Sequence, residues 1–115
     1  MKPQWFSTKI RQVCLIELEG ADLYWDSIFV FQAEDFDKAF QKALCLGKKQ
    51  EVEYVNANGG KVRWKFKEII SLDMIRQENL DEAEIYSESI DIPIKEREAF
   101  DSVFYPENSK PIQTI

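Results

Sequence analysis

The segment from residue 53 to residue 66, EYVNANGGKVRWKF, is the feature that most constrains the fold. Apolar and polar residues alternate on both sides of Asn58-Gly59-Gly60, which is the pattern of two antiparallel strands joined by a hairpin loop. We interpret these three residues as the loop, with Gly60 in the left-handed conformation that such loops need. This register places Tyr54 opposite Trp64. It predicts a sheet with one apolar face and one charged face.

The two faces of this hairpin differ in composition. The apolar face is predicted to be buried, and its members are Val52, Tyr54, Val62, Trp64 and Phe66. The other face carries the cations Lys61, Arg63, Lys65 and Lys67. In the same register Glu53 lies opposite Lys65 and Glu51 lies opposite Lys67. Cross-strand ion pairs are therefore expected to neutralise much of this cationic stripe.

Other segments also have strand patterns. Besides the first strand of the hairpin, four strands are predicted. They cover residues 5–18, 23–31, 61–75 and 84–90, and the range 61–75 begins with the second strand of the hairpin. In the first of them, Thr8 and Gln12 fall on the face that is otherwise apolar. Residues 28–31 are apolar on both faces, which is typical of an interior strand or of an interface.

One helix is predicted between the second strand and the hairpin. Its apolar stripe has helical spacing and consists of Phe36, Ala39, Phe40, Ala43 and Leu44. Asp35 suits the N-cap position. Gly47 is expected to end the helix in the left-handed conformation, with Lys48 and Lys49 at the negative end of the helix dipole.

The order of elements, β-β-α-β-β-β, predicts an α+β fold. We expect a mainly antiparallel sheet of about five strands with one helix packed on one face. Residues 1–91 are predicted to form a single domain, and residues 92–115 a C-terminal extension that is partly ordered or docked on it. Within the extension, a short helix is predicted from Lys95 to Phe104.

The composition restricts the location of the protein. Apolar runs fall short of the roughly 20 residues of a membrane span, so no membrane partner is expected. The N-terminal residues alternate and lack the apolar core of a signal peptide. Cys14 and Cys45 are too few for a disulfide framework or a zinc site, and both are expected to be core or boundary residues. These observations predict a cytoplasmic protein.

The chain contains no histidine, which removes the commonest general base and metal ligand. No catalytic residue, cofactor site or metal site is therefore predicted, and no cofactor is expected. The acidic residues near the end of the chain do not have the spacing of a calcium loop; they are Glu78, Asp81, Glu82, Glu84, Glu88 and Asp91. An enzyme with a carboxylate or metal site stays an alternative.

Charge is unevenly distributed along the chain. Residues 1–67 carry eleven Lys and Arg against nine Asp and Glu, whereas residues 68–115 carry four against twelve. A net charge of −6 disfavours nucleic acid as a partner, since affinity for phosphates depends on the cations presented. Arg63, Lys65 and Lys67 are nevertheless a candidate interaction surface, because cations on one strand could follow a phosphate backbone.

Several stretches resemble a bacterial family known as domain of unknown function 4288. The likeness covers about residues 5–89. Its most specific part is the hairpin pattern Glu53-Tyr54-x-Asn56-x-x-Gly59-x-x-Val62-x-Trp64-x-Phe66. The other matching positions are Trp5-Phe6, Phe29 to Ala33, Ala39, Ala43, Gly47, and Glu84 to Ser87. The resemblance implies a compact, freestanding bacterial α+β domain. It implies no activity and no catalytic or binding residue.

The favoured interpretation is a non-enzymatic protein that acts through protein–protein contacts as a homodimer. Its basis is that the doubly apolar second strand and the three tryptophans exceed what one helix can cover. The first alternative is an acidic inhibitor or immunity-type protein that neutralises a basic toxin or nuclease. In that case Glu82, Glu84 and Glu88 would contact the basic partner.

Overall fold

The structure is a computed structural model that describes residues 2–75 and 84–112, without the side chains of residues 22 and 84–87. Five strands and one α-helix occur in the predicted order. The strands are β1 (Gln4–Ile16), β2 (Gly20–Ala33), β3 (Val52–Val55), β4 (Lys61–Ile75) and β5 (Glu84–Asp91). The helix α1 spans Phe36–Lys49.

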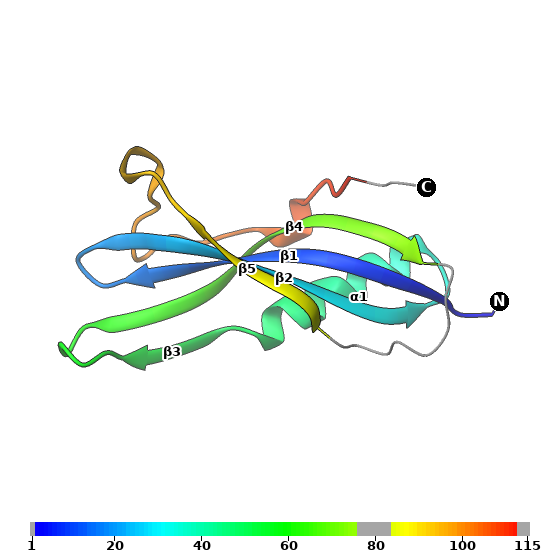
Figure 1. Cartoon of the computed structure of the whole chain (residues 1–115), viewed down its shortest axis with the longest axis horizontal. Coiled ribbons are helices and arrows are strands. Elements are labelled where there is room, and N and C mark those ends of the chain that lie inside the picture. Colours follow the sequence, from blue (N-terminus) through cyan, green and yellow to red (C-terminus); the bar gives the residue numbers. More distant parts are fainter. Residues whose placement is uncertain (1, 76–83, 113–115) are drawn as a thin grey trace.

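The strands form one sheet with the order β3-β4-β1-β2-β5, and each neighbouring pair is antiparallel. The helix α1 lies against one face of this sheet (Figure 1). The molecule is elongated, with principal extents of 50 × 25 × 20 Å. The predicted α+β fold with an antiparallel sheet and one packed helix is confirmed.

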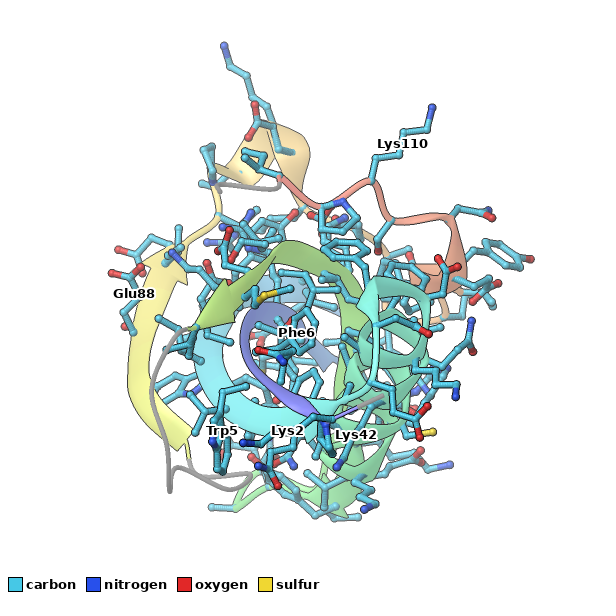
Figure 2. The ribbon with its side chains drawn as sticks, turned by 90° about the vertical axis from the view of Figure 1, so that its right-hand side faces the viewer. Lys2, Trp5, Phe6, Lys42, Glu88 and Lys110 are labelled. Atoms are coloured by element: carbon cyan, nitrogen blue, oxygen red, sulfur yellow. The ribbon has the colours of Figure 1, made fainter. Side chains whose placement is uncertain are left out.

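The main core lies between α1 and the sheet. Strands β1, β2 and β4 contribute alternate residues to it, as the two-residue period of a strand requires. Its buried members are Phe6, Ile10, Phe29, Phe31, Ala33, Ala39, Ala43, Leu46, Phe66, Ile69 and Leu72. Seen along the long axis, the strands curl around Phe6 (Figure 2). Burial of this apolar surface is the principal stabilising contribution to the fold.

Both ends of α1 can be compared with the prediction. The side chain of Asp35 accepts a hydrogen bond of 2.8 Å from the backbone N–H of Lys38, so the predicted N-cap is confirmed. The predicted C-cap is wrong, because Gly47 lies inside the helix and the cap is Gln50 with φ −83°. A Cβ atom at Gly47 would lie 2.3 Å from the ring of Phe66, so glycine here permits close contact between helix and sheet.

The predicted register of the β3–β4 hairpin is wrong by two residues. Tyr54 lies opposite Val62, and Val52 lies opposite Trp64. The loop comprises residues 56–60, and Gly59, with φ 81°, takes the left-handed position expected for Gly60. A shift of two keeps each side chain on its predicted face, because side chains alternate with a period of two.

The opposite face of the sheet contacts the segment that follows β5. Here Ile92 is buried with residues of β1 and β2, and Phe100 and Phe104 pack against the same cluster. The helix predicted from Lys95 to Phe104 is wrong, since only a 3-10 turn at Ile94–Glu96 forms there. The backbone carbonyl of Glu98 instead accepts a hydrogen bond from Ala21 at the start of β2, so the segment bonds to the sheet and not to itself.

Another 3-10 turn, at Pro106–Asn108, follows this segment. Beyond it, Ile112 forms an isolated parallel bridge with Ser71 of β4. Within the described ranges, no helix has the length and apolar character needed to span a bilayer.

Candidate binding surface

The helix-side face of the sheet continues past the C-terminal end of α1. The tips of the β1–β2 and β3–β4 hairpins project beyond the helix (Figure 1). On this part, which we call the bare end of the sheet, Trp25 is 38%, Tyr54 47% and Val52 51% exposed. The register places Trp25 opposite Gln12 and Val52 opposite Trp64, so these side chains share one face. The bare end is therefore an exposed, largely apolar surface.

A cleft of about 280 Å³ opens in the bare end, next to the last turn of α1. We call it the tryptophan cleft; it is lined by Gln12, Trp25, Gln50, Val52 and Trp64. The rings of Trp25 and Trp64 meet edge to face at 87°, with 6.4 Å between their centroids. The indole N–H of Trp64 donates to the Tyr54 hydroxyl at 3.3 Å. Trp64 is thus held in place, and the cleft has preformed aromatic walls.

Gln12 gives the tryptophan cleft its polar group. Only 8% of this residue is exposed, and its side-chain Nε2 has no hydrogen-bond partner. A buried N–H donor without an acceptor is unfavourable by about 1–3 kcal/mol. A ligand that places an oxygen acceptor beside Gln12, and an apolar group between the indoles, would remove this penalty and fill the cleft.

The prediction that the whole apolar face of the hairpin is buried is only partly right. Val62 and Phe66 are buried, whereas Val52 and Tyr54 are exposed and Trp64 is half-buried. The reason is the length of α1, which ends before it reaches the tips of the hairpins. Trp25 and Gln50 were not singled out in the sequence as site residues. Gln12 did stand out there, as a polar residue on an apolar face.

The cationic stripe lies on the opposite face of the sheet, and each of its three candidate residues is near a carboxylate. Arg63 lies 3.9 Å from Glu53, and Lys65 lies 3.3 Å from Glu51. Lys67 pairs with Glu98 at 2.6 Å. The shifted register explains why the partners differ from those expected. These contacts reduce the positive potential that a phosphate backbone would meet.

Of the three candidate acids, Glu82, Glu84 and Glu88, only Glu88 has its side chain among the described residues. Glu82 lies outside them. Glu84 starts β5, and its side chain is not described. Glu88 pairs with Lys9 at 3.2 Å.

A buried ion pair lies near the middle of the opposite face. Asp26 is fully buried and accepts two hydrogen bonds of 2.8 Å from Arg11, and Lys9 lies 3.8 Å away. The hydrogen bond to Asp26 raises the pKa of the Arg11 guanidinium. This two-bond geometry satisfies the carboxylate and fixes β1 to β2. It is a structural contact, since Asp26 has no open surface through which a substrate could reach it.

A second polar group on this face joins the sheet to the C-terminal segment. The Tyr24 hydroxyl donates to Glu98 at 2.8 Å, and Lys67 donates to the same carboxylate oxygen. Burial raises the pKa of Tyr24, and its hydrogen bond to Glu98 raises it further. Burial alone would raise the pKa of Glu98, but the hydrogen bonds from Lys67 and Tyr24 outweigh it and hold this pKa below its usual value.

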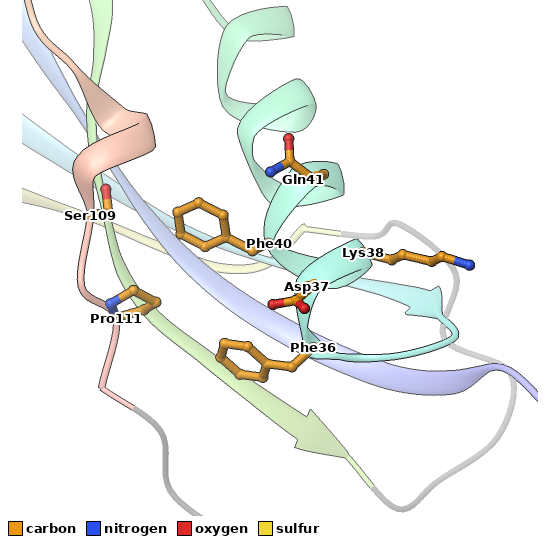
Figure 3. A pocket seen from close by; sticks show the side chains of 7 residues that line it. All are labelled: Phe36, Asp37, Lys38, Phe40, Gln41, Ser109 and Pro111. Atoms are coloured by element: carbon orange, nitrogen blue, oxygen red, sulfur yellow. The ribbon is translucent and has the colours of Figure 1, made fainter.

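A larger cleft, of about 470 Å³, lies between the first turns of α1 and the C-terminal segment (Figure 3). Phe36 and Phe40 form one wall, and Pro111 lies across from them. Two of its polar groups have partners in the protein: Lys38 pairs with Glu34, and the Ser109 hydroxyl donates to the Pro106 carbonyl. The tryptophan cleft is the stronger candidate, because the buried Nε2 of Gln12 in its lining has no hydrogen-bond partner.

Metal ligation gains no support from the described residues, in which no group of three or more His, Cys, Asp or Glu side chains could hold an ion. Cys14 is buried and Cys45 is exposed, and the two are not joined by a disulfide. Cys45 therefore differs from its expected place in the core or at its boundary.

The fold and the cleft define an α+β protein with one helix on its sheet and an exposed aromatic cleft at the uncovered end. The chain belongs to a family described as a domain of unknown function (DUF4288), whose profile matches residues 5–87. The resemblance seen in the sequence is thereby confirmed. Searches of curated proteins and of solved structures found no match to the chain.

Proposed function

We propose that the protein is a non-enzymatic bacterial protein that acts through protein–protein contacts as a homodimer, and that the bare end of the sheet is its contact surface. The observation that carries this proposal is the exposure of Trp25, Tyr54 and Val52 around a preformed cleft. Contiguous exposed apolar surface is unfavourable in water and is typical of sites that bind another protein. Tryptophan and tyrosine are also the residues that contribute most to such interfaces.

The size of the cleft supports a protein partner over a cofactor. At about 280 Å³ it is slightly below the range of sites that enclose drug-sized ligands, roughly 300–1,000 Å³. A single apolar side chain from a partner is a better match to this space. No specific contact supports the two alternative functions. For the acidic inhibitor, Glu88 already pairs with Lys9. For an enzyme with a carboxylate or metal site, no pair of carboxylates stands out among the described side chains.

A cytoplasmic location is part of the proposal. Its support is that Cys14 and Cys45 are not joined by a disulfide. Thiols persist in reducing compartments, whereas small secreted domains commonly use disulfides.

The proposal is tested by sedimentation equilibrium of the purified protein over a range of micromolar concentrations. We expect a reversible dimer. Trp25→Ala should weaken it by about 30-fold, because a buried tryptophan at an interface contributes about 2 kcal/mol or more. Tyr105→Ala is the matched control, since Tyr105 is an exposed aromatic residue in the C-terminal segment. A monomer at every concentration, or equal weakening by both variants, would contradict the proposal.

A further inference from the structure

The tryptophan cleft contains a polar side chain that is buried and lacks a partner. Gln12 is only 8% exposed, and its Nε2 has no hydrogen-bond partner. Other buried polar side chains of the sheet are satisfied: the Thr8 hydroxyl donates to the Ser71 carbonyl at 2.9 Å, and Asp26 accepts two hydrogen bonds from Arg11. Buried polar groups in native proteins nearly always have a partner. The donor of Gln12 is therefore one that an acceptor from outside the chain can satisfy.

The indoles in the lining of the cleft provide two flat walls. The ring planes of Trp25 and Trp64 meet at 87°, so they form a corner, and a planar ring that stacks on one indole meets the other at its edge. The hydrogen bond from Trp64 to the Tyr54 hydroxyl fixes one wall before any ligand binds, which reduces the ordering cost of binding. Such a corner favours a planar aromatic ring over a bulky aliphatic group.

The volume of the cleft limits its ligand to one ring system. About 280 Å³ is below the range of sites that enclose drug-sized molecules, roughly 300–1,000 Å³. The limit that disfavours a large cofactor still admits a molecule of the size of one aromatic side chain. A free ligand of this size would occupy the same space as a side chain from a partner.

The charges around the cleft distinguish a cationic ligand from one with an oxygen acceptor. Two perpendicular aromatic rings alone would suit a quaternary ammonium group. However, the lining of the cleft contains no acidic residue, and the last turn of α1 next to it carries Lys48 and Lys49. These cations and the N–H donor of Gln12 repel a positive ligand and favour a carbonyl oxygen, which carries a partial negative charge.

We propose that the tryptophan cleft binds a small planar aromatic molecule with a carbonyl oxygen, such as an aryl amide, and that this ligand competes with the second copy of the chain. The ring lies in the corner between the indoles, and the carbonyl oxygen accepts the hydrogen bond from Nε2 of Gln12. The ligand thereby lowers the fraction of dimer. The competition rests on the proposed function, whereas the binding site rests on the geometry of the monomer alone.

Benzamide is the probe, because it combines one aromatic ring with a carbonyl oxygen. Benzylamine is its matched control, since it keeps the ring but carries an ammonium group and no acceptor. In an NMR titration we expect benzamide to shift the indole N–H signals of Trp25 and Trp64, with a dissociation constant on the order of 1 mM. Benzylamine should bind at least tenfold more weakly. Trp5 is an internal control, because it is buried and does not line the cleft.

Gln12→Leu separates the hydrogen bond from the contact with the indoles. The variant keeps both tryptophans and should weaken benzamide binding about tenfold, while the weak binding of benzylamine stays unchanged, because only benzamide uses the Gln12 donor. Gln32→Leu is the matched control, since Gln32 is an exposed glutamine of β2 that does not line the cleft. Wild-type affinity in Gln12→Leu, or equal binding of benzamide and benzylamine, would overturn the inference.

Sedimentation equilibrium tests the competition with the second copy. Benzamide at ten times its dissociation constant should raise the dimer dissociation constant at least tenfold, because each copy must release the ligand before it pairs. A dimer that forms in a protein without benzamide binding would overturn this inference and leave the proposed function intact. Benzamide binding by a chain that is monomeric at every concentration would overturn the proposed function and leave the binding site intact. Binding that leaves the dimer unchanged would overturn the competition.

Discussion

At the scale of single residues, Gly47 shows how one missing methyl group sets the distance between two layers. The helix lies so close to β4 that the Phe66 ring occupies the space where a Cβ atom would be. Glycine lowers helix propensity by about 1 kcal/mol relative to alanine, so its presence inside α1 is locally unfavourable. The close packing of helix and sheet is what offsets this loss.

Gly47→Ala should therefore destabilise the protein despite its better helix propensity. We expect a loss of about 1–3 kcal/mol in the free energy of unfolding, measured by urea denaturation, because the ring of Phe66 must move out of a packed core. Gly60→Ala is the control: its added Cβ would lie 3.6 Å from the nearest atom, at Asn56. A stable Gly47→Ala variant would mean that helix and sheet are not this close.

Gln12 is the residue at which stability and binding are expected to conflict. Its buried Nε2 has no acceptor in the monomer. Gln12→Leu replaces the amide by an apolar group of similar size and removes the unsatisfied donor. We expect the monomer to gain about 1–3 kcal/mol in thermal or urea denaturation, and the dimer to weaken in sedimentation. Gln50→Leu, at an exposed position of the same cleft, should leave monomer stability nearly unchanged.

At the scale of elements, the hairpin shows what the sequence can and cannot predict. Alternation identified both strands and the correct face for each side chain, because a period of two is insensitive to a shift of two. The exact pairing depends on the loop. Asn56 closes it, since its side-chain oxygen accepts hydrogen bonds from the N–H groups of Asn58 and Gly60 at 2.9 and 3.0 Å. A three-residue loop cannot contain these bonds, so the sequence-based register was wrong.

Asn56→Ala should weaken the hairpin by about 1–2 kcal/mol, because two backbone N–H groups lose their acceptor. Urea denaturation measures the change. The control is Asn58→Ala, since Asn58 takes part through its backbone and not its side chain in these bonds. Equal losses in the two variants would show that the loop does not depend on the Asn56 carboxamide.

The candidate site was predicted less well than the fold, and the cause is the position of α1 along the sheet, since the helix itself was expected to end near Gly47 and ends at Lys49. The sequence indicated a helix over an aromatic face, but residue patterns do not reveal how far that helix reaches along a strongly twisted sheet. Trp64 was therefore expected beneath α1, whereas it lines an open cleft with Trp25. Trp25 lies opposite Gln12 on the neighbouring strand. This pairing follows from the register of β1 against β2, which the sequence did not predict.

At the scale of the whole molecule, the uneven charge along the chain is used partly inside the fold. Glu98, from the acidic half, accepts hydrogen bonds from Tyr24 and Lys67 of the first half. The carbonyl of Phe100 accepts another from Arg63 at 3.0 Å. The C-terminal segment is thus attached to the sheet by polar contacts as well as by Phe100 and Phe104. No local pattern predicts these contacts, because they join residues far apart in sequence.

This attachment predicts how stability depends on pH. The pKa of Glu98 is lower in the folded protein than in the unfolded chain, so its ionised form stabilises the fold above the unfolded value, about 4.3. That contribution is lost as the pH falls through the lower, folded value. The pKa of Tyr24 is raised, so its contribution is present below the unfolded value of about 10 and is lost as the pH rises further.

Glu98→Gln tests this linkage. The variant should be less stable than the wild type at pH 7, and the difference between the two should shrink as the pH is lowered below about 4, because the wild-type carboxylate is then protonated. Thermal unfolding across this pH range measures the effect, with Glu96→Gln as the control, since Glu96 is exposed in the neighbouring 3-10 turn. A constant difference between wild type and Glu98→Gln at all pH values would contradict the role of the ionised carboxylate.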